Sequence, residues 1–336
     1  MDLKTLTEIN APSGHEQAIR RFLLDKLKKL GFSPVLDRMG NVVVVKEGTG
    51  DAPRKRVMVS AHMDEVGLIV TSATEDGYLR IAAAGGIDPR VLVSKRVTVG
   101  EDKLPGVIGA VPIHLQSAAE RKHVLSMDEL LVDIGAKSKD EAECKAPMGT
   151  YISFDTPYVE YGDGFACGKA FDDRVGCLSL LRLLQEELPV DLVACFVSEE
   201  EVGCRGAKGA AFQQEPDIGI VLEGTTCNDL GDVPETAHVC EAGQGVTVSF
   251  MDGASIANRA LFRKALDVAK QENIPHQVKH SVSGGNDGGA IQRAREGVPV
   301  VVLSVPCRYI HSPSSVVKLS DVESQFALVK ALVKAL

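Results

Sequence analysis

From about residue 165 to the end of the chain, short apolar segments without polar alternation are separated by helical patterns of about ten or more residues. A strand with one face in water alternates apolar and polar residues, whereas a strand covered by helices on both faces does not. This pattern predicts an α/β fold with a mixed sheet sandwiched by helices. The expected strands cover 192–197, 218–222, 246–250 and 298–305, and helices are expected from Gly203, over about 257–272 and from about 319.

Upstream, the N-terminal region predicts a helix followed by a hairpin. Ser13 and Glu16 have the spacing of a capping box, and apolar residues then recur at helical spacing until Gly31. Apolar residues on both sides of Met39-Gly-Asn predict a hairpin over 34–45.

Residues 71–163 have a different character, with short β-like runs interrupted by Gly and Pro. We interpret this stretch as a small, barrel-like all-β domain inserted into the α/β domain. The expected α/β domain therefore consists of residues 1–70 and 164–336.

Five short segments carry His, Asp or Glu where a strand of the α/β domain is expected to end. The apolar strand over 57–61, for example, leads directly into His62. Because sites in open α/β sheets lie outside the carboxyl ends of the strands, these segments are predicted to converge. They are Ala61–Gly67, Lys169–Arg174, Ser198–Gly203, Val221–Thr226 and Arg308–Pro313.

The residue types in these segments suit hydrolysis by a pair of divalent cations. Two such ions, about 3.5–4 Å apart, need a bridging carboxylate and a mixture of imidazole and carboxylate ligands. A further carboxylate must stand near the attacking water to take its proton. The consecutive Glu200 and Glu201 can divide these duties.

Each segment also has a purely structural interpretation. His62 and Asp64 could form a structural hydrogen bond, the Glu199–Glu201 run could be a solvated helix start, and Asp172-Asp173 could cap a helix. The joint occurrence of five such segments favours a site.

The ordered motifs AHMDEVG, AFDDRVGC, EEVGCRGA, EGTT and RYIHS resemble those of metallo-aminopeptidase family forty-two, the tetrahedral or glutamyl aminopeptidases. The resemblance spans nearly the whole chain and implies a zinc-exopeptidase-like fold. It also implies two divalent metal ions per subunit, zinc or cobalt with manganese as an alternative. Their expected ligands are His62, Asp172, Glu201, Glu223 and His311.

Carried over residue by residue, the resemblance implies that Asp172 bridges the two metals. His62 and Glu223 would complete one side, and Glu201 and His311 the other. Two further residues have expected catalytic roles: Glu200 would be the general base, and Asp64 would orient the His62 ring. Asp173 would contact the ligands without binding metal itself.

The implied activity is hydrolysis of N-terminal residues from short peptides. Two rival interpretations are a metallo-deacylase or carboxypeptidase of related fold, and a metal-binding assembly protein without turnover. The complete set of ligands and the expected base, Glu200, argue against the second rival.

Two segments depart from the family pattern. Glu199 adds a third acid beside the usual pair and is expected to face solvent. The segment that begins with the loop Gly284–Asp287 reads Gly-Gly-Asn-Asp-Gly-Gly, and relatives more often have Thr and then Ala within it. Both a role in the substrate wall and a tight turn into a helix carrying Ala290 remain open for this loop.

Charge and composition exclude other partners. The net charge of −9, with no prominent run of Lys and Arg, argues against nucleic acid, and no apolar run approaches the ~20 residues of a membrane span. Eight scattered cysteines without a CxxC pair predict reduced thiols and a cytoplasmic location. The family resemblance implies a homo-oligomer, a dodecamer assembled from dimers that form through the inserted domain.

Overall fold

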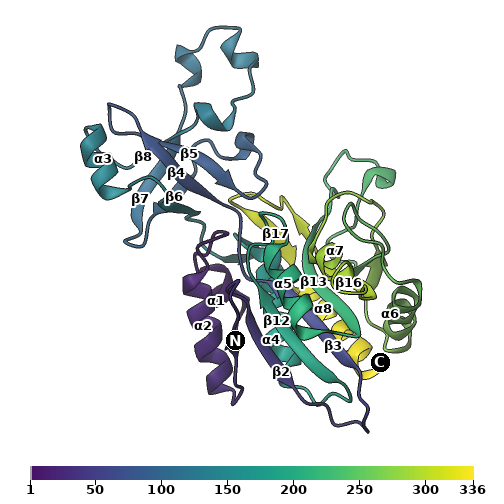
Figure 1. The fold of residues 1–336 in the computed structure, drawn as a ribbon. Coiled ribbons are helices and arrows are strands. Elements are labelled where there is room, and N and C mark those ends of the chain that lie inside the picture. Colours follow the sequence, from purple (N-terminus) through teal and green to yellow (C-terminus); the bar gives the residue numbers. More distant parts are fainter. Residues whose placement is uncertain (1) are drawn as a thin grey trace.

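A computed structural model describes residues 2–336 of the chain and contains one large sheet and one closed barrel (Figure 1). The sheet order is β1-β2-β12-β3-β13-β16-β17-β11-β10, and β14 joins β16 and β15 outside this path. The four neighbours β12, β3, β13 and β16 are parallel, and the flanking pairs are antiparallel except β14 with β15. The strands are β1 (Val35–Leu36), β2 (Val42–Lys46), β3 (Arg56–His62), β10 (Val159–Tyr161), β11 (Phe165–Gly168), β12 (Asp191–Val197), β13 (Ile218–Thr226), β14 (Val246–Ser249), β15 (His276–Val278), β16 (Val300–Arg308) and β17 (Ser315–Lys318).

Helices cover both faces of the sheet, because its strands bury side chains in both directions. In β3, Val57 and Val59 pack into the core under α2, α4, α6 and α8, whereas Met58 packs into the core under α5 and α7. The predicted α/β sandwich is therefore confirmed. Within residues 2–336, no helix is both long and apolar enough to span a bilayer. The helices are α1 (Leu3–Thr7), α2 (Gln17–Lys29), α3 (Lys139–Lys145), α4 (Phe171–Leu183), α5 (Arg205–Gln214), α6 (Arg259–Gln271), α7 (Asp287–Gln292) and α8 (Leu319–Lys334).

The inserted domain is a closed antiparallel barrel with the strand order β4-β5-β8-β7-β6-β9. It has its own apolar core, which includes Leu68, Leu79 and Ile152. The first strand begins at Gly67, before the expected start of the insert at residue 71. The barrel strands are β4 (Gly67–Ala73), β5 (Leu79–Ala84), β6 (Arg96–Val99), β7 (Leu104–Gly109), β8 (Leu131–Asp133) and β9 (Tyr151–Phe154). Short 3₁₀ turns lie at Pro89–Val91, Ile113–Leu115, Glu120–Lys122, Met127–Glu129 and Glu235–Ala237.

The predicted N-terminal helix and hairpin are present, but the predicted capping box is wrong. Helix α2 starts at Gln17, and Ser13 donates its hydroxyl to Asp64 Oδ2 at 2.6 Å instead of capping the helix. The Glu16 side chain accepts from the backbone of Gly14 at 2.8 Å. A buried carboxylate distant in sequence thus competes successfully with the local helix end for the Ser13 hydroxyl.

The side chain of Asn41 ties the β1–β2 hairpin to the loop that follows β12. It is fully buried, its Oδ1 accepts from Ser198 N at 2.9 Å, and its Nδ2 donates to Asp37 Oδ2 at 2.7 Å and to Gly206 O at 3.0 Å. These bonds fix the backbone immediately before Glu199.

We expect Asn41→Ala to lower the free energy of unfolding by about 2–3 kcal/mol, because the substitution leaves buried backbone groups of Ser198 and Gly206 without partners. Urea titration of the purified protein measures this loss. Gln271→Ala, which removes an exposed amide at the end of α6, is the matched control. Equal unfolding midpoints for the two variants would contradict the assignment.

Candidate active site

The five predicted segments converge at one edge of the sheet. His62 is the last residue of β3, the Glu199–Glu201 run follows β12, and His311 follows β16. These strands belong to the parallel group β12-β3-β13-β16, so their carboxyl ends meet at one edge. Glu223 differs from expectation, since β13 continues to Thr226 and places Glu223 inside the strand rather than after it.

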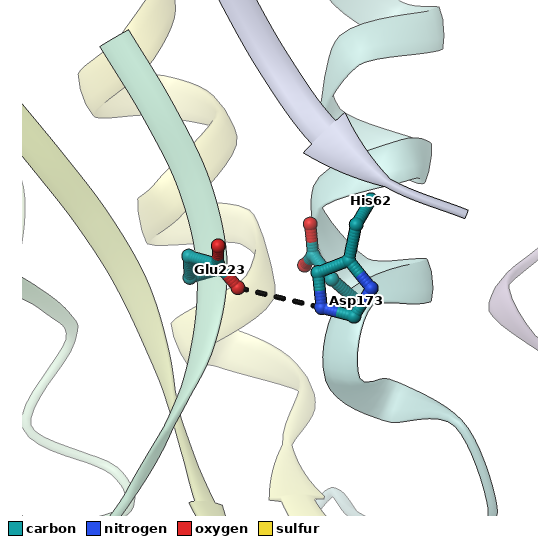
Figure 2. Close-up of side chains that lie close together, drawn as sticks. All are labelled: His62, Asp173 and Glu223. Carbon is teal, nitrogen blue, oxygen red and sulfur yellow. Dashed lines mark ion pairs between the residues drawn. The ribbon is translucent and has the colours of Figure 1, made fainter. Parts of the chain in front are cut away.

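His62 lies at the centre of the buried half of the cluster. Figure 2 shows it directed toward Glu223 on β13, with Asp173 from the first turn of α4 beside it. His62 Nε2 is 3.5 Å from Glu223 Oε2 and 3.2 Å from Asp172 Oδ1. Burial disfavours the protonated ring, but hydrogen bonds with Asp172, Asp64 and Glu223 outweigh it and raise the pKa of His62.

Asp172 lies between the two imidazoles and presents one oxygen to each. Its Oδ1 faces His62, and its Oδ2 is 3.4 Å from His311 Nε2. A Cβ at residue 224 would lie 3.0 Å from Asp172 Oδ1, so glycine at this position permits the close approach. On the far side, His311 Nε2 is 3.3 Å from Glu201 Oε2.

The barrel also contacts this site. The carbonyl of Gly86, which follows β5, lies 3.0 Å from Nδ1 of His311. Burial lowers the pKa of His311, but the hydrogen bond with Asp172 acts in the opposite direction, and the pKa is raised to about 9. The inserted domain thus positions one imidazole of the cluster.

Asp64 connects the His62 strand to the glutamate loop. Its Oδ1 is 3.4 Å from His62 Nδ1 and accepts from the backbone of Glu200 at 3.1 Å, while Oδ2 accepts from the backbone of Glu201 at 3.2 Å. The carboxyl is fully buried, yet these bonds and that from Ser13 keep its pKa below the ordinary value. Asp64 therefore orients His62 and both glutamates together.

The side chains of the adjacent residues Glu199 and Glu200 lie in different surroundings. The Glu200 carboxyl accepts from the Cys204 thiol at 3.3 Å, and burial raises its pKa to about 8. Glu199 pairs with Arg205 at 3.2 Å near the surface. Glu200 is thus a buried carboxyl whose raised pKa lies close to neutral pH.

Residues 40–328 match the M42 glutamyl aminopeptidase family. The chain belongs to this family. The lysyl aminopeptidase of Pyrococcus furiosus is 33% identical, with 99% of this chain and 96% of the relative covered. The glutamyl aminopeptidase of Lactococcus lactis is also 33% identical, with 99% and 95% covered. The TET1 peptidase of Pyrococcus horikoshii, which assembles into a tetrahedron or a large octahedral shell, superposes with a TM-score of 0.87 at 33% identity, covering 99% of this chain and 98% of that structure.

Membership of the M42 family makes this protein an aminopeptidase, which removes N-terminal residues from peptides. The predicted family, fold class and enzyme class are confirmed.

The donor set fits divalent cations. Possible ligand atoms of His62, Asp172 and Glu201 lie within 4.8 Å of one another. Glu223 Oε1 is buried and has no hydrogen-bond partner among the described residues. An unpaired buried carboxylate oxygen is costly, and a cation among these oxygen and nitrogen donors would satisfy it. This M42 chain therefore has the residues for a metal centre.

Two further buried carboxyls, those of Asp173 and Asp287, lie beside the cluster. Asp173 Oδ1 accepts from Gly176 N at 2.9 Å, as expected of a helix cap, while its Oδ2 is buried and has no hydrogen-bond partner in the described part of the chain. Asp287, at the start of α7, is fully buried and lies near Glu200 and Cys204, and neither of its oxygens has a hydrogen-bond partner within residues 2–336. Sequence reasoning placed Asp287 only in a glycine-rich loop; its position directly after the capping Asn286 was the available signal.

Burial also raises the pKa of Glu223 to about 8, and raises the pKa values of Glu201, Asp173 and Asp287 well above the ordinary range. Close carboxylates add to this effect by mutual repulsion. A bound cation acts in the opposite direction, because its ligands must be deprotonated.

These shifts predict a pH-dependent stability for protein stripped of metal. Glu200 and Glu223 hold their protons up to about pH 8 and His311 up to about pH 9 when folded, against ordinary values of 4.5 and 6.5. The folded chain thus binds more protons than the unfolded chain, so stability falls as pH rises from about 5 to 9. The slope is about 1.4 kcal/mol per pH unit for each group that titrates in this window.

Urea midpoints at pH 5.5 and 8.5 test this expectation with chelated protein, and the zinc-loaded protein is the control. The chelated protein should be less stable at pH 8.5, and zinc should remove the difference. A higher midpoint at pH 8.5 in the chelated protein would refute the predicted sign.

The loops that carry the site contain several non-glycine residues in the left-handed region of φ and ψ. Glu199 has φ 54°, and His311 has φ 56°. Such conformations are held by their surroundings and gather at functional sites. The others in these loops are Ala170 (φ 57°), Cys204 (φ 53°) and Tyr309 (φ 57°).

A cavity of about 160 Å³ adjoins the cluster, and we refer to it as the polar pocket. The segment Gly284–Asn286 forms part of its wall, and the Asn286 side chain also caps α7 by accepting from Gly288 N at 2.8 Å. The predicted tight turn into a helix is therefore present, whereas a role of this loop in the substrate wall stays a prediction. The lining residues are Asp172, Glu200, Glu223, Gly224, Thr225, Thr226, Ser249, Lys279, Ser283, Gly284, Gly285, Asn286, Ser304, Ile310 and His311.

Proposed function

We propose that this aminopeptidase works with two divalent cations, zinc or cobalt with manganese as an alternative, and with Glu200 as its general base. The observation that carries the proposal is the position of Asp172, whose two oxygens face different imidazoles. A bridging carboxylate needs this arrangement. The proposed ligands are His62, Asp172, Glu201, Glu223 and His311.

The distances support the division of ligands between two positions. His62 and Glu223 lie on the Oδ1 side of Asp172, and Glu201 and His311 lie on its Oδ2 side. When bound, the cations would polarise the substrate carbonyl and acidify a water molecule. Asp64 keeps the His62 ring in place through its contact with Nδ1.

Glu200 then moves the proton. Its carboxylate accepts a proton from the attacking water and delivers it to the nitrogen of the departing amine. Burial raises the pKa of the Glu200 carboxyl and a nearby cation would lower it, and a pKa close to the working pH favours both taking up and returning a proton. Glu200 lies outside the two ligand groups, so it is free for this exchange.

Aminoacyl-p-nitroanilides and their N-acetylated forms test the proposal, with apo protein reconstituted separately with zinc, cobalt and manganese. We expect turnover of free-amine substrates and loss of activity on chelation. Turnover of the acetylated forms alone would favour the metallo-deacylase interpretation. Bound metal without turnover of any substrate would favour a binding protein.

We also propose that the protein self-assembles through its barrel into a dodecamer, as a cytoplasmic enzyme. The support is an apolar surface on the segment after β7, which extends beyond the barrel on the side away from the sheet (Figure 1). Its exposed residues are Val111, Ile113, Leu115 and Val124. Such a surface marks an interaction site. The eight free thiols suit a reducing compartment. A monomeric mass by light scattering in the presence of metal would contradict the assembly.

A further inference from the structure

We propose that Lys279 selects substrates whose N-terminal residue has a carboxylate side chain, glutamate or aspartate. This inference rests on the proposed function of the adjoining cluster. The relatives named above include both a lysyl and a glutamyl enzyme, so membership of the family does not fix the preferred residue.

The charged side chains that line the polar pocket have two different origins. Every charged or imidazole side chain on its wall belongs to the proposed catalytic cluster except Lys279. The rest of the wall consists of glycine, hydroxyl and amide residues together with Ile310. Outside the catalytic cluster, a substrate side chain in this pocket would therefore meet one positive charge in otherwise uncharged polar surroundings.

The backbone around Lys279 holds this ammonium in a defined place. The residue follows β15, and its backbone N donates to Val248 O at 3.1 Å, which extends the pairing of β14 with β15. Its Nζ donates to Ser283 O at 3.0 Å, across the turn that forms the pocket wall. The residue is only 6% exposed.

Within residues 2–336, no carboxylate lies within the 4.0 Å of an ion pair with Lys279. A buried ammonium served by a backbone carbonyl alone carries a desolvation cost that an opposite charge would offset. A substrate carboxylate entering the pocket would supply that charge and a charge-assisted hydrogen bond.

The same wall disfavours other side chains. A cationic side chain would meet the Lys279 ammonium as a like charge, and an aliphatic one would cover the hydroxyls of Ser249, Ser283 and Ser304 without offering them a hydrogen-bond partner. The volume of about 160 Å³ suits one side chain rather than a longer segment. Selection would therefore act on the N-terminal residue.

The test compares kcat/KM for glutamyl-, leucyl- and lysyl-p-nitroanilide in the metal-loaded enzyme. We expect the wild type to prefer the glutamyl substrate. Lys279→Met keeps the length of the side chain and removes its charge, so the glutamyl-to-leucyl ratio should fall about 100-fold. Lys279→Arg keeps the charge and should keep the order of preference. Lys270→Ala, which removes an exposed lysine on α6, should leave the ratio unchanged.

Two results would overturn the inference while leaving the aminopeptidase mechanism intact. One is a wild type that hydrolyses leucyl or lysyl substrate faster than glutamyl substrate. The other is a Lys279→Met variant in which all three substrates lose kcat/KM equally, as expected if the lysine only supports the Ser283 turn. A metal-loaded wild type that hydrolyses no aminoacyl substrate would overturn the proposed function and this inference together.

Discussion

Replacing Glu200 by glutamine is expected to lower kcat by about 10²–10⁴-fold while leaving two metal ions per chain. The amide keeps the size of the side chain and cannot take a proton from water. The Glu200 side chain contacts Cys204, and the two imidazoles form ion pairs with Asp172, Glu223 and Glu201, so the substitution should leave those pairs in place. Steady-state kinetics and elemental analysis of the same preparation measure the two quantities.

Glu199→Gln is the matched control, because it makes the same chemical change one residue away. Glu199 pairs with Arg205 near the surface, and its loss should leave kcat close to that of the wild type. Near-normal turnover in metal-loaded Glu200→Gln would show that another group carries the proton. A loss of metal equal to the loss of turnover would make Glu200 a ligand instead.

Asp172→Ala is expected to abolish binding of both metals and to lower turnover at least about 10⁴-fold, since metal ions supply several kcal/mol of transition-state stabilisation. The two oxygens that face His62 and His311 disappear together. Affinity should fall by more than the ~10–100-fold typical of residues that only support a ligand. Competition with a chromogenic chelator measures the affinity, and elemental analysis measures the stoichiometry.

Asp25→Ala, which removes an exposed carboxylate on α2, is the control for loss of charge and should bind metal as the wild type does. If Asp172→Ala retained two ions per chain, the bridging role would be refuted. If it lost only one ion, Asp172 would belong to a single metal position.

The sequence was most informative about the parallel core and its edge. Apolar strands without alternation have to be covered on both faces, and the carboxyl ends of neighbouring parallel strands have to meet. For that reason the positions of His62 and Glu201 at one edge could be predicted before any coordinates. The short outer strands β10, β11 and β17 were missed, because three or four residues carry too little periodicity.

Contacts between distant segments could not be predicted. Ser13 has a good local partner in the sequence pattern, yet it binds Asp64, 51 residues away. Lys279 has no motif around it, and its position in a pocket wall depends on the pairing of β14 with β15. For Ser13, tertiary packing overrode a local signal, and for Lys279 no local signal existed.

The carbonyl of Gly86 that contacts His311 makes the inserted barrel a structural support of the catalytic centre. If His311 binds metal as proposed, any association that shifts the Gly86 segment also shifts the metal affinity of His311, and metal binding in turn shifts the association, because coupling between two equilibria is reciprocal. Quaternary state and catalytic competence are then linked functions of protein concentration. Dilution, which dissociates an oligomer, would then lower turnover without any inhibitor being bound.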